Sequence, residues 1–253
     1  MKSIVKVLGL TAVMAFVGSQ AQAQFRQSIF LNGALPTGQF ASKVNTNRFN
    51  NLGVPITDAS VPLYREEMAK AATAGFGLGY RVSYRFDVGM GEVAPFAQAD
   101  VFWNFINSDW SDKYIQAKGK APNYFNIPVM LGVSYLYDEL WNDITPYAEF
   151  GVGADLFILG AEKVVVDNKT YTYSYKPTVA LSWMIGAGAY FGRHVSAGLY
   201  YYGLGKHIVN YSDKTYNSFT DEEKEVLNDP NSPKSVIPTR TIGELAIRIG
   251  FHF

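Results

Sequence analysis

The sequence predicts an all-β fold: an eight-stranded antiparallel up-and-down transmembrane β-barrel, preceded by a cleaved signal peptide. Three observations predict it. Eight segments alternate between apolar and polar residues, the connections between them alternate between long and short, and the last segment ends on an aromatic residue. In that segment, Thr239–Phe253, one face carries Leu245, Ile247 and Ile249, and the other face carries the charged residues. A period of two indicates a strand whose two faces have different surroundings.

The first 23 residues have the three parts of a secretory signal. Lys2 and Lys6 form the basic part, Val7–Gly18 is an apolar stretch too short to span a bilayer as a helix, and Ala21-Gln22-Ala23 is a small-x-small cleavage site. We therefore expect a signal peptide over residues 1–23 and a barrel domain over residues 24–253. The chain has no Cys, so it can form neither disulfides nor thiolate sites.

Eight later segments are long enough for transmembrane strands, which need about 9–11 residues at a strong tilt. The expected strands are Phe25–Leu35, Thr73–Phe86, Val93–Ile106, Asn123–Tyr137, Thr145–Leu159, Pro177–Phe191, Val195–Asn210 and Thr239–Phe253. No apolar run after the signal approaches the length of a transmembrane helix.

The connections between these strands alternate in length. Four are long and polar: Pro36–Ala72, Asn107–Pro122, Gly160–Lys176 and Tyr211–Pro238. Three are short: Asp87–Glu92, Asp138–Ile144 and Gly192–His194. Outer-membrane barrels have short periplasmic turns and long extracellular loops, so the long connections are expected outside the cell. Composition further predicts short helices within two loops, over Pro62–Ala72 and over Thr220–Leu227.

Charge distinguishes a membrane barrel from a soluble one. Eleven of the fourteen lysines lie in the long loops, and only Lys206 lies in an expected strand. A soluble barrel would spread lysines over its outer surface. The charged strand residues all share the face opposite the aliphatic set: Arg26, Arg81, Arg85, Asp100, Glu149, Asp155, Lys206, Arg240, Glu244 and Arg248. Because an Arg or Lys facing lipid costs about 2–4 kcal/mol at the midplane, this face is expected to line the lumen.

Glycines and aromatic residues support the same assignment. Small residues suit a crowded interior, and the polar face carries Gly77, Gly79, Gly132, Gly151, Gly153, Gly186, Gly188 and Gly250. The lumen is also expected to hold Phe30, Phe96, Phe102, Tyr147, Phe157, Tyr190, Tyr200 and Tyr202. On the aliphatic face, many aromatic residues lie near strand ends, where interfacial girdles form.

The lumen is expected to be largely filled, since side chains can occupy the interior of an eight-stranded barrel. Its charge cluster comprises Arg81, Arg85, Asp100, Glu149, Asp155, Glu244 and Arg248. We expect the three arginines to pair with the four carboxylates, because buried charges need partners. The alternative interpretation is a gated or very narrow ion path.

The sequence does not predict an enzyme. It lacks the His-Glu-x-x-His, Gly-x-Ser-x-Gly and P-loop motifs, and we expect neither a cofactor nor a metal site. His194-Val195-Ser196 resembles the His-x-Ser pair of the lipid A deacylase family. It lies at a short turn, on the periplasmic side in the expected topology, whereas the deacylase acts on the outer leaflet. The balanced charge gives no indication of nucleic-acid binding.

The chain resembles small bacterial outer-membrane β-barrel proteins of the OmpA/OmpX/OmpW-type eight-stranded architecture, in particular the porin-like outer membrane protein beta-barrel domain family. The residues that carry the resemblance are Asn126–Leu131, Pro146–Gly151 and the C-terminal strand. The resemblance implies a location in the cell outer membrane, contact with its lipids, and assembly by periplasmic chaperones and the barrel-insertion machinery. It further implies that Phe251 and Phe253 form the C-terminal assembly signal. The family has no shared catalytic set.

Three functions remain open at this point. The first is a structural or interaction role, in which the long loops contact a protein or glycan partner, with Tyr171, Tyr173, Tyr175, Tyr211 and Tyr216 as aromatic anchors. The second is a narrow porin-like passage for ions or small solutes. The third is an accessory barrel of a secretion complex or a lipid-modifying barrel enzyme.

Overall fold

The computed structural model describes residues 25–41, 72–108, 111, 119–137, 143–166, 169–221, 224–225 and 239–253. The expected signal peptide lies outside these residues. The expected helix over Pro62–Ala72 also lies outside them, except for Ala72, which is the first residue of a strand. Part of the second expected loop helix is described. There, the backbone nitrogen of Lys224 donates to the carbonyl oxygen of Thr220 at 3.0 Å, which is a helical hydrogen bond.

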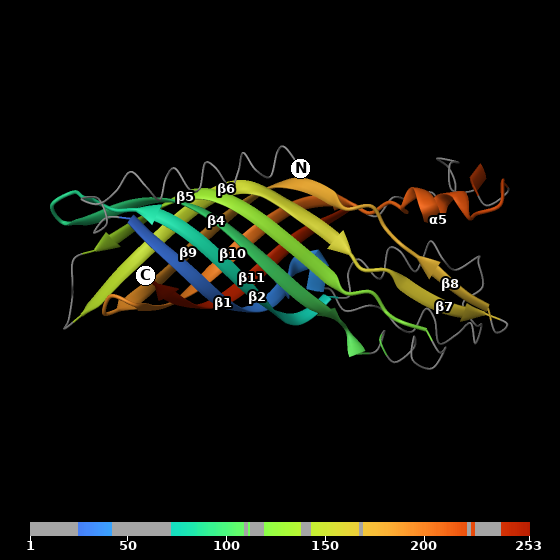
Figure 1. The fold of residues 1–253 in the computed structure, drawn as a ribbon, viewed down its shortest axis with the longest axis horizontal. Coiled ribbons are helices and arrows are strands. Elements are labelled where there is room, and N and C mark those ends of the chain that lie inside the picture. Colours follow the sequence, from blue (N-terminus) through green and yellow to red (C-terminus); the bar gives the residue numbers. More distant parts are fainter. Residues whose placement is uncertain are drawn as a thin grey trace.

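All eight expected strands are present, and they form one closed antiparallel barrel (Figure 1). Their order around the barrel is β2-β1-β11-β10-β9-β6-β5-β4, and pairing of β2 with β4 closes the sheet. The barrel strands are β1 (Phe25–Thr37), β2 (Ala72–Tyr84), β4 (Gly91–Ile106), β5 (Tyr124–Tyr137), β6 (Ile144–Leu159), β9 (Thr178–Phe191), β10 (Val195–Ile208) and β11 (Thr239–His252). A two-residue strand, β3 (Phe86–Asp87), extends the β2–β4 hairpin. No described helix is long and apolar enough to cross a membrane.

The expected loop Gly160–Lys176 contains a hairpin that was not predicted from the sequence. Strands β7 (Glu162–Val166) and β8 (Lys169–Tyr173) pair with each other and not with the barrel sheet. A short helix, α5 (Asp213–Asn217), follows β10 and is capped by the Ser212 hydroxyl, which accepts from the Thr215 nitrogen at 3.3 Å. These elements project beyond one end of the barrel in Figure 1, opposite the end that holds the C-terminus.

The barrel is apolar outside and polar inside, as predicted. The outward side chains include Leu131, Val179 and Leu181, which are 65%, 69% and 86% exposed. Arg81, Asp100, Glu149 and Arg248 are buried in the interior. An outer surface of this kind is stable only against lipid, so the fold is that of an outer-membrane β-barrel.

The predicted inward placement of Lys206 is wrong. A bulge in β10 shifts its pairing with β11 between Gly203 and Gly205, and Gly205 has a φ of +89°. The extra residue reverses which face each later side chain occupies, so Lys206 is exposed and His207 is buried. A glycine suits this position because L side chains rarely adopt such a φ.

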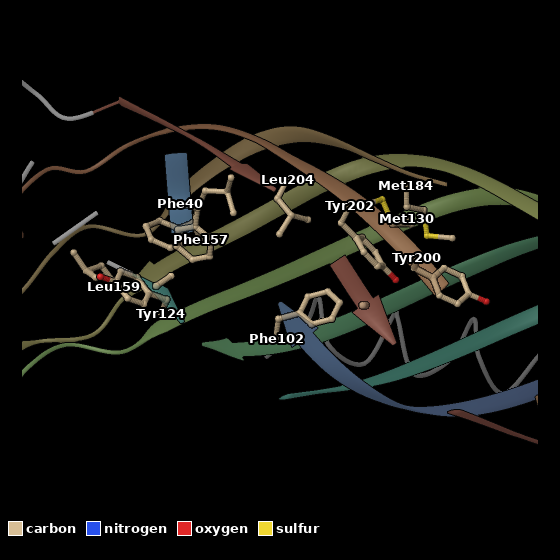
Figure 2. Packing of buried hydrophobic residues seen from close by; sticks show 14 of the residues in the cluster. Phe40, Phe102, Tyr124, Met130, Phe157, Leu159, Met184, Tyr200, Tyr202 and Leu204 are labelled. Carbon is tan, nitrogen blue, oxygen red and sulfur yellow. The ribbon is translucent and has the colours of Figure 1, made fainter. Parts of the chain in front are cut away.

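Bulky side chains close the extracellular half of the lumen (Figure 2). Phe40 lies on the 3-10 helix η1 (Gly38–Ala41), and none of its surface is exposed. Its ring makes edge contacts with Tyr124 at 5.3 Å and Phe157 at 6.3 Å between centroids. Together with Leu159 these residues form an aromatic lid, so the chain just after β1 folds back over the lumen.

Candidate functional site

The middle of the lumen holds two buried arginine–carboxylate pairs. Arg81 donates to both carboxylate oxygens of Glu149, at 2.6 and 2.7 Å. Arg248 donates from Nη2 to Asp100 Oδ1 at 3.1 Å, and its Nη1 lies 3.9 Å from Glu149 Oε1. The four residues come from β2, β4, β6 and β11, so the pairs bridge opposite walls. With charges balanced and the bidentate geometry that arginine favours, the pairs meet the conditions for a stable buried ion pair.

Neutral groups join the two pairs into one network, called here the arginine network. Gln98 Oε1 accepts from Arg81 Nε at 2.7 Å and from Arg248 Nη1 at 3.2 Å. Asn32 Oδ1 accepts from Arg248 Nε at 2.9 Å, and the Tyr202 hydroxyl contacts Arg248 and donates to Asp100. Each arginine is therefore held by several partners, which fixes its orientation across the lumen.

Aromatic rings pack on both guanidinium groups. Arg248 lies 4.2 Å from the ring centroid of Phe30 and 4.0 Å from that of Tyr200. Arg81 lies 3.9 Å from the ring centroid of Phe96. These cation–π contacts fill the space that water would occupy in an open channel.

The structure separates the remaining predicted charges from this network. Asp155 lies nearer the extracellular end, where its Oδ2 is 3.1 Å from His207 Nε2. Glu244 accepts from Asn104 Nδ2 at 3.0 Å. Arg85 pairs with Glu92 at 2.9 Å at the periplasmic rim. The predicted pairing of Arg85 with the four lumen carboxylates is therefore wrong, because β2 ends just before this residue, at the mouth of the barrel.

A buried Ser–His–Ser group near the periplasmic end was not predicted. His252 Nδ1 is 2.7 Å from the Ser28 hydroxyl, and His252 Nε2 is 2.8 Å from the Ser196 hydroxyl. The three residues lie on β1, β11 and β10, which are consecutive around the barrel and include the seam where the first and last strands pair. The signal in the sequence is that all three share the lumen face at the same end of their strands. In contrast, His194 is exposed and does not pair with Ser196, although the two are close in sequence.

A polar hollow of about 660 Å³ opens at the end that carries the short turns. Its lining includes three arginines, three acidic residues and Tyr190. The ring of Tyr190 lies between the Arg85 guanidinium, 4.8 Å from the ring centroid, and the His252 ring, 4.6 Å between centroids. The hollow is thus the periplasmic vestibule, and its lining includes no residue of the arginine network.

At the opposite end, three of the expected aromatic anchors are buried. Tyr173, Tyr175 and Tyr211 are 9%, 7% and 5% exposed. Tyr175 stacks on Tyr211 at 5.4 Å between centroids, and Phe219 packs against Tyr211 at 5.1 Å. The prediction that these three tyrosines anchor a partner is therefore wrong. Their role is to form a small aromatic core that joins the β7–β8 hairpin to the α5 segment.

Comparison with known proteins gives matches among solved structures alone. No protein-family model and no curated protein matches this chain. Among solved structures, a major outer membrane protein from Thermus thermophilus aligns at 12% identity and a TM-score of 0.44, covering 90% of this chain and 99% of that one. OprG from Pseudomonas aeruginosa aligns at 13% identity and a TM-score of 0.40, covering 91% and 95%. The outer membrane enzyme PagL aligns at 12% identity and a TM-score of 0.37, covering 89% and 98%. Strand pairing, the apolar exterior and the charged interior together make this chain a small eight-stranded outer-membrane β-barrel.

Proposed function

We propose that this protein is a non-enzymatic barrel that acts through its extracellular loops and does not conduct through its lumen. The observation that carries the proposal is the arginine network. Two charge pairs with satisfied hydrogen bonds cross the lumen at its middle, and opening a path would separate charges that are buried from water. The aromatic lid gives a second barrier at the extracellular end.

The β7–β8 hairpin supports a role in interaction. It extends beyond the membrane-spanning barrel, and its base is held by the aromatic core and by a backbone bridge between Lys120 and Lys163. An ordered projection of this kind costs less entropy on binding than a flexible loop does. The expected partner is a protein or glycan at the cell surface.

A narrow passage is the second candidate, and one observation favours it. The Arg248 guanidinium lies between two carboxylates, 3.1 Å from Asp100 and 3.9 Å from Glu149. An exchange of partners would move the positive charge across the lumen, as a gate requires.

Single-channel recording distinguishes the two candidates. Folded wild-type protein in a planar bilayer should be silent if the network seals the lumen. The variants to compare are Arg248→Ala, which opens space at the network, and Arg85→Ala, a matched change at the rim. Steady wild-type openings that change in size with Arg248→Ala but not with Arg85→Ala would refute the sealed lumen and support a gated passage.

The interaction role needs a separate test. Wild-type protein in proteoliposomes and a variant in which a short Gly-Ser linker replaces residues 161–173 would be applied to arrays of surface glycans and surface proteins. We expect the variant to fold, since the hairpin pairs with no strand of the barrel sheet, and to lose the binding of the wild type. Equal binding by both proteins, or no binding by the wild type, would refute a function based on this hairpin.

A further inference from the structure

A ring of polar side chains lies in the lumen between the aromatic lid and the arginine network. Six strands each contribute one residue to this ring, called here the polar belt. Its members are Asn104 on β4, Asn126 on β5, Asp155 on β6, Thr178 on β9, His207 on β10 and Glu244 on β11. Their positions along the strands place them between the aromatic lid and the arginine network. For example, Asn126 follows Tyr124 of the lid on β5, and Glu244 precedes Arg248 of the network on β11.

The belt is only partly hydrogen-bonded. Asn104 reaches Glu244 past the intervening strands β1 and β2, where Ala34 and Gly75 pair with each other and are small. On the other side, His207 Nε2 is 3.1 Å from Asp155 Oδ2, and its Nδ1 is near the Thr178 hydroxyl.

Several buried atoms in the belt have no hydrogen-bond partner among the described residues. Outside the Asp155–His207 ion pair, they are Glu244 Oε2, Asn104 Oδ1 and both polar atoms of the Asn126 side chain. Glu244, Asn104 and Asn126 all have an exposed fraction of zero. A buried polar group without a partner costs about 1–3 kcal/mol, and an ionised group costs more. Asn104 and Asn126 are diagonal neighbours, since Asn104 pairs with Tyr124 and Phe102 pairs with Asn126, and Asn104 contacts Glu244. Three unpartnered oxygens in this part of the lumen therefore point to a bound group that satisfies them.

The charges of the belt support the same inference. Arg81 and Arg248 are paired with carboxylates of the arginine network, and His207 is the only basic side chain in the belt. It lies beside Asp155. The described hydrogen-bond partner of Glu244 is the neutral Asn104. Among the described residues, no basic side chain pairs with Glu244.

We propose that the polar belt binds a hard cation, Ca²⁺, through the Glu244 carboxylate and the amide oxygens of Asn104 and Asn126. Hard cations prefer carboxylate and amide oxygens. Asn104 donates its amide nitrogen to Glu244, which leaves its oxygen free for such an ion. The described residues contain no group of three or more His, Asp or Glu side chains arranged for a metal, so the donor set does not suit zinc.

Calcium retention by the folded barrel tests this proposal. The protein would be refolded in a nonionic detergent without lipid, in EDTA or in CaCl₂, because the buried belt is most accessible during folding. After gel filtration, bound Ca²⁺ and the thermal midpoint of the gel-mobility shift would be measured. We expect about one Ca²⁺ per chain and a midpoint raised by roughly 5–10 °C when Ca²⁺ is about 100-fold above its Kd.

Three variants locate the ion. Glu244→Gln and Asn126→Leu should retain less Ca²⁺ and show a smaller shift of the midpoint, whereas Glu92→Gln, a matched change at the periplasmic rim, should behave as wild type. Wild-type protein that does not respond to Ca²⁺, Mg²⁺ or Na⁺ would overturn the proposal, as would a full Ca²⁺ response in Glu244→Gln. A Glu244-dependent response to Mg²⁺ or Na⁺ alone would overturn the assignment to Ca²⁺. These results are independent of whether the lumen conducts.

Discussion

Replacing Arg248 with methionine should strongly destabilise the barrel. The side chain has no exposed surface and donates to Asn32, Gln98 and Asp100. Methionine fills a similar volume but leaves the Asp100 carboxylate buried without its cation. Removing one partner of a buried ion pair costs about 3–5 kcal/mol. We therefore expect the free energy of unfolding to fall by about that amount.

A double-mutant cycle separates the lost charge from the lost packing. Asp100→Asn removes the partner charge, so adding it to Arg248→Met should restore part of the stability, and the two effects should not add. Arg85→Met is the surface control, because Arg85 pairs with the part-exposed Glu92 and such pairs contribute about 0–1 kcal/mol. Urea titration of refolded protein in detergent, followed by tryptophan fluorescence, gives the free energy of unfolding of each variant.

Two results would refute the reasoning. If Arg248→Met cost no more than Arg85→Met, the network would not be a buried, dry pair. If the single changes at Arg248 and Asp100 were simply additive, the 3.1 Å contact between them would carry no coupling energy.

Three further predictions test other parts of the lumen. A Cβ on Gly153 would lie 1.9 Å from the Val129 carbonyl oxygen, so Gly153→Ala should lower the free energy of unfolding by about 1–3 kcal/mol in urea titration. Gly33→Ala should be tolerated, because a Cβ there would lie 3.9 Å from its nearest neighbour. Equal losses of stability in the two variants would contradict this account. Phe40→Ala removes a ring from the aromatic lid, so it should lower the free energy of unfolding by about 3–5 kcal/mol. It should also speed the reaction of a small thiol reagent with a cysteine placed in the lumen. An unchanged labelling rate would show that the lid does not limit access. His252→Phe leaves two serine hydroxyls without their partner, so the free energy of unfolding in the same titration should fall by about 1–3 kcal/mol for each. A stability equal to that of the wild type would show that the two hydrogen bonds do not stabilise the seam.

The sequence alone was sufficient for the architecture, because each element depends on a local pattern. Alternation with a period of two distinguishes the lipid face from the lumen face within every strand, and the cost of charge against lipid assigns the two faces. Loop lengths then set the order and direction of the strands. For this reason the inward placement of Arg81, Asp100, Glu149 and Arg248 was predicted correctly.

The tertiary structure decided which lumen groups meet. Ser28 and His252 are 224 positions apart, and closure of the barrel brings them together. The shift at Gly203 and Gly205 turned His207 inward and Lys206 outward, because one inserted residue inverts an alternating pattern. Partner choice depends on strand stagger around the closed barrel, which no local pattern encodes. That stagger places Glu149 beside Arg81 and leaves Glu244 and Asp155 outside the arginine network.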